Sequence, residues 1–525
     1  MKVVDRRDFI RIVITGSLAS MACPRPGGLR TGAGPGAPGA GDSAEGASAG
    51  ARPASAVQAD HYAICHAVRD GTEFRMPAPT RHLPIVIVGA GGAGLFAARE
   101  LGDLDYLMLE REPMVGGNAT GGNWRGVPYS AGTSYNNNAD LLAIAREVGV
   151  AMRPIDSVDG AVVQDTFIPE FLTKGLDRAP WPQAAKDGFR RYLETYGTYD
   201  VEKDAERLDN IPLDEILKDY PPQVREFIDA FGPNSWGGRV ADTSAYVGIE
   251  AAQWMGGIEP HRYTGDEGFG GLTRALGERV AARGAGRLVT GAAVVRVEEK
   301  DGKVLVAYAP PGAPEDLTRL ECVSADTVIM AAPKLIARRL VAGLPDDQKK
   351  AMESIRYIPY IVANLCFDGV VHESCFDTNI LGSPVMSDVV CADFPRLRGQ
   401  GARDRPTVLT CYMPLTEDDR VLMLDDEEVK KRAFAALDGI DRWFPGAAAK
   451  CREIAIRLRG HPMHLSTCGM ITRIGPAARR SLGAIHFAGT DGIGNVSDLA
   501  TALESGRAAA KLARASIDAA ARRRG

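Results

Sequence analysis

The feature that most constrains this chain is a glycine-rich turn between an apolar run and a helix-forming run. Residues 83–88 are apolar and mostly β-branched, which predicts a strand buried on both faces, and residues 95–101 predict a helix. Glycines in such a turn let the backbone approach a pyrophosphate closely, and the helix N-terminus offers it free N–H groups. We therefore predict a dinucleotide-binding turn at Gly89, Gly91, Gly92, Ala93 and Gly94.

A carboxylate follows this turn at the spacing that a dinucleotide fold requires. The apolar run 106–109 predicts a second strand, and it ends at Glu110, twenty-one residues after Gly89. A carboxylate at that place binds the two hydroxyls of an adenosine ribose. Strand, glycines, helix, strand and acid together predict a Rossmann-type unit, which both NAD and FAD can occupy.

Three later segments favour FAD. A loop with a glycine doublet follows Glu110, and its backbone can pass close to a second phosphate. The runs 287–297 and 327–333 predict further strands, and residues 484–492 predict a strand that ends in a glycine turn before a helix. A second strand–turn–helix unit can hold the ribityl chain and flavin of a longer cofactor. The predicted contacts here are Arg111, Gly116, Gly117, Asn118, Gly489, Asp491 and Val496.

These motifs together resemble the flavin-containing amine oxidoreductase superfamily, which includes monoamine and polyamine oxidases. The resemblance extends over residues 82–507. It implies an α/β fold in which a discontinuous Rossmann-type FAD-binding domain is interleaved with an α+β substrate domain. It also implies that Val294 holds the adenine through its backbone, and that Asp491 contacts the pyrophosphate or the ribityl chain.

The sequence departs from the family pattern at two places. Asn118 follows the glycine doublet, where the family usually has arginine. The strand predicted at 360–367 has no lysine, whereas many amine oxidases of the family place one near the flavin N5. Lys334 belongs to a different element, and we expect it at the surface. The run 66–71 and the small residue after Asn118 resemble the twin-arginine spermidine dehydrogenase branch.

The gaps between the cofactor segments predict the domain boundaries. The FAD-binding domain is expected to comprise residues 61–155, 264–344 and 461–525. The substrate domain is expected to comprise residues 156–263 and 345–460, which contain most of the aromatic side chains that a pocket could use.

The N-terminal residues predict export. Residues 1–22 combine the pair Arg6–Arg7 with an apolar run too short to span a bilayer, as in a twin-arginine signal peptide; an amphipathic helix is the alternative. A lipid anchor on Cys23 is a further alternative, although Ser20 stands where a large aliphatic residue is expected. Residues 23–60 predict a disordered linker, because they hold few side chains large enough to offset the entropy of ordering. We expect a periplasmic or otherwise exported protein.

Composition excludes several other classes. The balance of 62 Lys+Arg against 67 Asp+Glu gives a net charge of −5, which offers no reason to expect a nucleic-acid partner. The nine cysteines form no CxxC pair, so neither a zinc site of that type nor a covalently attached c-type haem is expected, and no metal ligands are predicted.

Candidates for the substrate site lie near the predicted flavin. Two histidines precede the closing motif by about twenty-five residues, and either could take a proton or bind an amine or carboxylate. An acid and aromatic rings before the glycine-rich run 268–272 could hold a cationic amine. Packing in the core is the alternative for each. The catalytic candidates are His461, His464 and Tyr263, and the candidates for the pocket wall are Trp124, Tyr129, Tyr135, Trp254, Glu259 and His261.

Together these features predict an exported FAD-dependent oxidoreductase that transfers a hydride from an amine C–N bond to the flavin N5. The resulting imine would be hydrolysed by water, and the electrons would pass to oxygen or to a carrier such as a cytochrome or a quinone. Two alternatives stay open. One is a desaturase or isomerase of an apolar substrate, and the other is a catalytically silent flavoprotein that acts as a partner of another protein.

Overall fold

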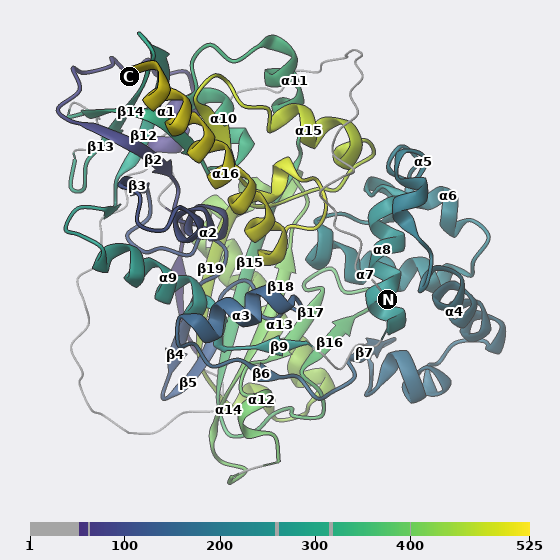
Figure 1. Ribbon diagram of the computed structural model, residues 1–525. Helices are drawn as coiled ribbons and strands as arrows, with labels where there is room; N and C mark the ends of the chain where they lie inside the picture. Colours follow the sequence, from purple (N-terminus) through teal and green to yellow (C-terminus); the bar gives the residue numbers. More distant parts are fainter. Residues whose placement is uncertain (1–51, 61–62, 258–261, 314–318, 400, 525) are drawn as a thin grey trace. The chain divides into compact units, whose positions relative to one another are not determined.

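The computed structural model describes residues 52–60, 63–257, 262–313, 319–399 and 401–524 (Figure 1). The residues from Pro53 onward belong to one unit. The predicted signal peptide, Cys23, Glu259 and His261 lie outside the described residues.

One seven-stranded sheet carries the glycine turn. Its order is β11-β3-β2-β14-β13-β12, and β20 pairs with the end of β14. Five of these strands run parallel, so their carboxyl ends meet at one edge, where the cofactor segments lie. The strands are β2 (His82–Val88), β3 (Tyr106–Glu110), β11 (Leu288–Thr290), β12 (Ala293–Lys300), β13 (Lys303–Ala309), β14 (Glu321–Met330) and β20 (Ile485–Phe487).

Helices cover both faces of this sheet, which explains why β2 is apolar on both sides. On one face, α16 packs closely on α2, because Gly506 has no side chain; a Cβ there would lie 2.4 Å from the carbonyl oxygen of Ala93. This face carries α2 (Gly92–Leu101), α3 (Ala139–Glu147), α9 (Gly270–Ala282) and α16 (Leu499–Arg524). The other face carries α1 (Ala63–Arg69), α10 (Lys334–Leu340), α11 (Asp346–Ser354) and α15 (Gly475–Ala478).

A second sheet of eight strands has the order β1-β19-β15-β18-β17-β16-β7-β8. Its long strand β15 begins, and its antiparallel neighbour β19 ends, beside the segment that follows β20, and α13 packs over β1, β15 and β19. The strands are β1 (Ala54–Gln58), β7 (Gly160–Val163), β8 (Thr166–Ile168), β15 (Tyr357–Asp368), β16 (Asp377–Ile380), β17 (Asp388–Cys391), β18 (Pro406–Pro414) and β19 (Cys451–His464). The helices with it are α12 (Phe394–Leu397), α13 (Asp426–Trp443) and α14 (Ala447–Lys450).

A helical cluster, drawn in teal in Figure 1, adjoins the far end of this sheet through α7, which contacts β16, β17 and β18. Its core holds rings such as Phe171, Phe189 and Phe227. The cluster comprises η2 (Phe171–Gly175), η3 (Leu176–Arg178), α4 (Gln183–Tyr196), η4 (Val201–Asp204), α5 (Ala205–Asp209), α6 (Leu213–Leu217), α7 (Pro222–Trp236), η5 (Val240–Asp242) and α8 (Ala245–Gly257).

Short elements join these parts. The hairpin of β4 (Gly121–Trp124) and β5 (Val127–Ser130) follows the glycine doublet and packs on β18. The remaining elements are β6 (Arg153–Pro154), β9 (Tyr263–Thr264), β10 (Asp266–Phe269), η6 (Asp418–Leu424), η7 (Met470–Ile474) and η8 (Thr490–Gly492).

The predicted linker ends earlier than residue 60, where the sequence analysis placed its boundary. β1 pairs in parallel with β19, with Val57 opposite Ile456. The segment holds a single large apolar side chain, so it has almost nothing to bury by itself. The edge of β19 supplies backbone partners that the local sequence does not reveal.

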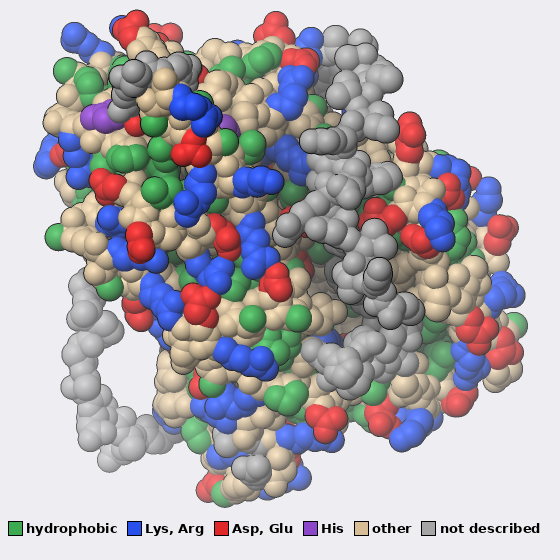
Figure 2. All heavy atoms as spheres, viewed as in Figure 1, with side chains coloured by type: hydrophobic (Ala, Val, Ile, Leu, Met, Phe, Trp, Pro, Cys, Tyr) green, Lys and Arg blue, Asp and Glu red, His purple; other side chains and the backbone are tan. Residues whose placement is uncertain are grey.

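Basic and acidic side chains are interspersed over the face shown in Figure 2, in agreement with the small net charge. Among the helices of the described residues, none combines the length and the apolar character needed to cross a bilayer.

Candidate functional site

The glycine turn has the geometry that a bound pyrophosphate needs. A Cβ at Gly94 would lie 2.0 Å from the carbonyl oxygen of Gly89, so the turn closes only with glycine at 94. Gly91 and Gly117 also lie close to each other, because a Cβ on Gly117 would lie 3.0 Å from the Cα of Gly91. Helix α2 begins at Gly92 and presents its first N–H groups at this edge.

Glu110 lies at the neighbouring strand end, as predicted. Its buried carboxylate accepts hydrogen bonds from the backbone N–H groups of Ala90 (2.6 Å) and Glu112 (2.8 Å), and burial raises its pKa. The N–H of Ala292 donates to its carbonyl (2.8 Å), which places the start of β12 beside it. Val294 lies at an irregularity in the β12 ladder close to this point. The groups predicted to hold the ADP half therefore meet at one edge, and this cradle fits FAD.

The glycine doublet forms the next part of the edge. Gly116 and Gly117 both have positive φ, and the Gly116 N–H donates to the carbonyl of Ala90 (2.9 Å). The side-chain amide of Asn118 donates to the carbonyl of Pro462 (2.6 Å). The doublet thus joins the first cofactor segment to the end of β19.

The closing segment centres on an ion pair. Asp491 accepts hydrogen bonds from Lys334 Nζ (2.8 Å), the Lys334 backbone N–H (2.7 Å) and the Tyr357 hydroxyl (2.6 Å). Burial alone would raise the pKa of Asp491, but the charge of Lys334 and these donors lower it. The expectation that Lys334 lies at the surface is wrong, because this lysine is fully buried and forms an ion pair with Asp491. A cofactor contact of Asp491 stays a prediction.

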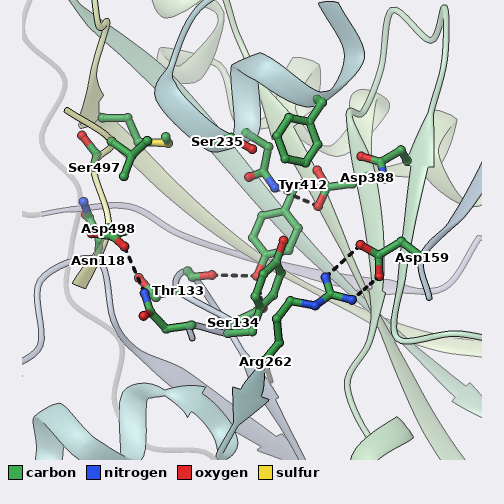
Figure 3. Close-up of a pocket in the computed structure, with 18 of the residues that line it drawn as sticks. Asn118, Thr133, Ser134, Asp159, Ser235, Arg262, Asp388, Tyr412, Ser497 and Asp498 are labelled. Carbon is green, nitrogen blue, oxygen red and sulfur yellow. Dashed lines mark hydrogen bonds and ion pairs between the residues drawn. The ribbon is translucent and has the colours of Figure 1, made fainter. Parts of the chain in front are cut away.

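A cavity of about 300 Å³ begins at the doublet and extends toward the helical cluster (Figure 3). Val496 lines it at the cofactor end, as do neighbours on β19 and before α16. Its cofactor end is lined by Asn118, Gly132, Thr133, Arg459, Met463, Val496, Ser497 and Asp498. Its far end is lined by Tyr135, Asp159, Phe227, Phe231, Asn234, Arg262, Tyr360, Asp388 and Tyr412.

The polar groups of the far end are fixed by one another. Arg262 forms a two-point ion pair with Asp159 (2.6 and 2.8 Å) and stacks over the ring of Tyr135 at 4.9 Å. Figure 3 shows the pair of Arg262 with Asp159. Asn234 donates to Asp388 (2.9 Å). Burial raises the pKa of Asp388 to about 7, because the carboxylate lies in a poorly solvated wall.

A second acid lies beside this wall. Asp377 is 3% exposed, and its Oδ1 has no hydrogen-bond partner among the described residues. Burial, and then the neighbouring charge of Asp388, raise its pKa well above the ordinary value. Asp377 therefore takes up a proton more readily than an ordinary aspartate.

The two histidine candidates do not line the cavity. Burial lowers the pKa of both, to about 3 for His461. His461 lies edge-on to the ring of Tyr357, with centroids 6.2 Å apart. His464 is fully buried, and its Nδ1 lies 2.7 Å from the hydroxyl of Ser497. Their intervening neighbours Pro462 and Met463 face the cavity instead.

Tyr263 belongs to the core of the FAD-binding sheet and not to the cavity. Its hydroxyl donates to the carbonyl of Asn138, and its ring packs near Phe269 at 6.0 Å. Arg262 faces the cavity in its place. Successive side chains of an extended segment point to opposite sides, so a one-residue difference separates a core position from a site position.

Of the aromatic residues predicted for the pocket wall, some line the cavity and others pack elsewhere. Tyr135 lines the cavity, as predicted. Trp124 instead donates to Glu453 (3.1 Å) and packs with Tyr129 in a small separate cluster. Trp254 lies on α8, and its side chain is outside the described part of the chain.

The polar residues of the far end could not be predicted from the sequence, because no motif surrounds them. The one available signal was a lone acid at the start of a short apolar run, as in Asp388-Val389-Val390-Cys391. An acid in such a strand is buried at a high free-energy cost and is often functional.

Comparison with known proteins gives an independent view. A family model described as flavin containing amine oxidoreductase matches residues 93–513. Oxidoreductase PigB of Serratia sp. (strain ATCC 39006) is 22% identical and covers 85% of this chain and 78% of its own length. Putative flavin-containing monoamine oxidase AofH of Mycobacterium tuberculosis (strain ATCC 25618 / H37Rv) is 27% identical over 43% of this chain and 54% of its own.

Solved structures show the same fold. Putrescine oxidase bound to putrescine has a TM-score of 0.61 at 18% identity, over 82% of this chain and 98% of that one. Cyclohexylamine oxidase from Brevibacterium oxydans IH-35A has a TM-score of 0.62 at 17% identity, over 82% and 99%.

Proposed function

We propose that this chain, which belongs to the flavin-containing amine oxidoreductase family, oxidises a small cationic amine held by Asp388 in the cavity. FAD-dependent amine oxidation is the activity of the family. The substrate ammonium first releases one proton to water, which frees the nitrogen lone pair. The carbon next to nitrogen then loses a hydride, the lone pair forms the C=N bond, and water converts the iminium to a carbonyl compound and an ammonium ion. Bound FAD supplies the acceptor for the two electrons.

The observation that carries this proposal is the buried carboxylate of Asp388 in an aromatic wall. Asp159 is paired with Arg262, and Asp498 caps α16 through the Thr501 N–H (2.7 Å). Asp388 accepts a hydrogen bond from Asn234 and has no cation beside it among the described residues. A substrate ammonium would supply that cation.

The aromatic lining adds to this preference. Tyr135, Tyr360 and Tyr412 surround the same space as two phenylalanines of α7, and ring faces attract cations. A polyene desaturase or isomerase would need an apolar tunnel, which an ionisable aspartate in the wall opposes. The residues at this end bind and orient the amine, and the doublet end holds the cofactor.

The proposal is tested by anaerobic titration of the purified holoenzyme with monoamines, diamines and apolar polyenes, while the visible flavin absorbance is recorded. We expect bleaching by at least one class of amine. Bleaching by a polyene alone would favour the desaturase or isomerase, and no bleaching by any compound would favour the silent partner.

The pH dependence follows from the raised pKa of Asp388. Below about pH 7 this carboxyl is neutral and attracts an ammonium weakly; above it the charged form is present. We expect kcat/KM to rise about tenfold per pH unit on the acid side and to level off near pH 7. A stopped-flow pH profile of flavin reduction measures this, and Asp388→Asn should lack the acid limb. An unchanged limb in that variant would assign the titration to another group.

We also propose that the chain is exported through the twin-arginine pathway and passes its electrons to oxygen or to a carrier outside the cytoplasm. The support is the pair Arg6–Arg7 before a short apolar run. Replacing both arginines with lysine should leave flavin-loaded, active enzyme in the cytoplasm. Cell fractionation measures this, and continued export of the double variant would contradict the proposal.

A further inference from the structure

Two buried arginines on β19 share one carboxylate. Arg457 and Arg459 lie two residues apart on a strand, so their side chains extend from the same face. Each is 6% exposed, and Asp60 Oδ1 lies 3.0 Å from the first guanidinium and 3.3 Å from the second. The Nε–H of each is buried and has no acceptor among the described residues.

The surrounding charges leave this site positive. Among the described residues, Glu112 is a second carboxylate that acts on Arg459, and Arg111 already pairs with it at 2.7 Å. Among these described groups, three guanidiniums, those of Arg111, Arg457 and Arg459, face two carboxylates. Burial lowers the pKa of Arg459 to about 10. This is expected for a cation that loses its hydration and whose neighbouring carboxylates do not fully replace it. A further negative charge would stabilise the site.

The position of Arg459 identifies where that charge belongs. Its guanidinium donates to the Thr120 hydroxyl (2.8 Å), two residues after Asn118. Arg459 and Asn118 both line the cavity at the cofactor end, whereas Arg457 does not line it. The unsatisfied donor thus lies beside the doublet loop and not at the protein surface.

We propose that Arg459 contacts the negative charge of FAD, and that Asp60 is the counter-ion that holds this guanidinium in place. The charge is that of the diphosphate or that of the flavin pyrimidine edge, which becomes more negative on reduction. Asn118, in the doublet loop, offers no positive charge to either group, and Arg459 on β19 supplies one.

The proposal also explains why the chain before the first Rossmann strand is ordered. The pairing of β1 with β19 sets Gln58 opposite Arg457, and Asp60 follows two residues later. The pairing of β1 with β19 therefore places the carboxylate of Asp60 next to Arg457 and Arg459. The segment that resembled a linker completes the cofactor site.

The first experiment compares Arg459→Met with Arg457→Met, a matched loss of the other arginine that Asp60 binds. We expect Arg459→Met to weaken FAD binding about tenfold, measured by titrating apoprotein and following flavin fluorescence, or to lower the midpoint potential measured by dye equilibration. Weakened binding of oxidised FAD identifies the diphosphate, and a lowered potential alone identifies the flavin edge. Arg457→Met should change neither quantity more than about twofold.

A second variant covers the case in which Arg459→Met does not fold. Asp60→Asn keeps both arginines and removes their counter-charge, so it should destabilise the apoprotein and make FAD raise the melting temperature more than in the wild type. A purely structural role of Asp60 would lower both melting temperatures equally. That result, or unchanged affinity and potential in Arg459→Met, or equal effects in Arg457→Met, would overturn the proposal.

Discussion

Asp388→Asn should reduce kcat/KM for the amine substrate by about a hundredfold or more while the flavin content stays that of the wild type. Removing one member of a buried charge pair typically costs 2–5 kcal/mol, and about 1.4 kcal/mol corresponds to a factor of ten. The loss should lie mainly in the apparent affinity, because the carboxylate anchors the ammonium. Asp388 is on β17 in the second sheet, away from the glycine turn, so cofactor binding should persist.

Asp377→Asn is the matched control. Asp377 lies on the neighbouring strand β16, is equally buried, and does not line the cavity. Burial raises its pKa well above the ordinary value, so a neutral amide is a mild replacement for this carboxyl. We expect a change in kcat/KM of less than about threefold. Wild-type kinetics in Asp388→Asn, or an equal loss in Asp377→Asn, would remove Asp388 from the substrate site.

Lys334→Met should destabilise the protein by about 3–5 kcal/mol, the usual effect of removing one partner from a buried ion pair. Asp491 is buried and lies 2.8 Å from the Lys334 ammonium, so the substitution leaves a carboxylate without its compensating charge. The apparent melting temperature of the holoenzyme should fall markedly, as measured by calorimetry or by circular dichroism.

The double variant Lys334→Met with Asp491→Asn separates charge from packing. It removes both charges, so we expect it to recover part of the lost stability, whereas an effect of packing alone would be additive. Lys350→Met on the exposed part of α11 provides the control and should change stability by less than about 0.5 kcal/mol. A melting temperature of Lys334→Met within the range of Lys350→Met would show that the ion pair contributes little.

Much of the cofactor half could be predicted from the sequence. The strands expected at 83–88 and 106–109 and within 484–492 are confirmed as β2, β3 and β20, and the helix after the turn is confirmed as α2. These elements are local, because each is set by the apolar pattern and the glycines of a few consecutive residues. The close approach at Gly94, where a Cβ would meet backbone at 2.0 Å, is the physical reason for the motif itself.

The errors have a common cause. The local sequence of β1 predicts a linker, because the order of this segment depends on the edge of β19, almost four hundred residues later. Lys334 was expected in solvent because its partner Asp491 lies far along the chain. A single sequence shows the type of a residue. It does not show the distant group that hydrogen-bonds to its backbone or neutralises its charge.

The sequence by itself determined the cofactor class and the Rossmann-type turn, since a phosphate-binding turn is built from adjacent residues and leaves a readable spacing. Only the tertiary structure shows which residues line the substrate cavity. Asp159, Arg262, Asp388 and Arg459 come from separate segments and meet through the pairing of strands. Whether a side chain such as Arg262 or its neighbour Tyr263 faces that cavity depends on the direction of an extended chain, and this direction is fixed by packing and not by residue type.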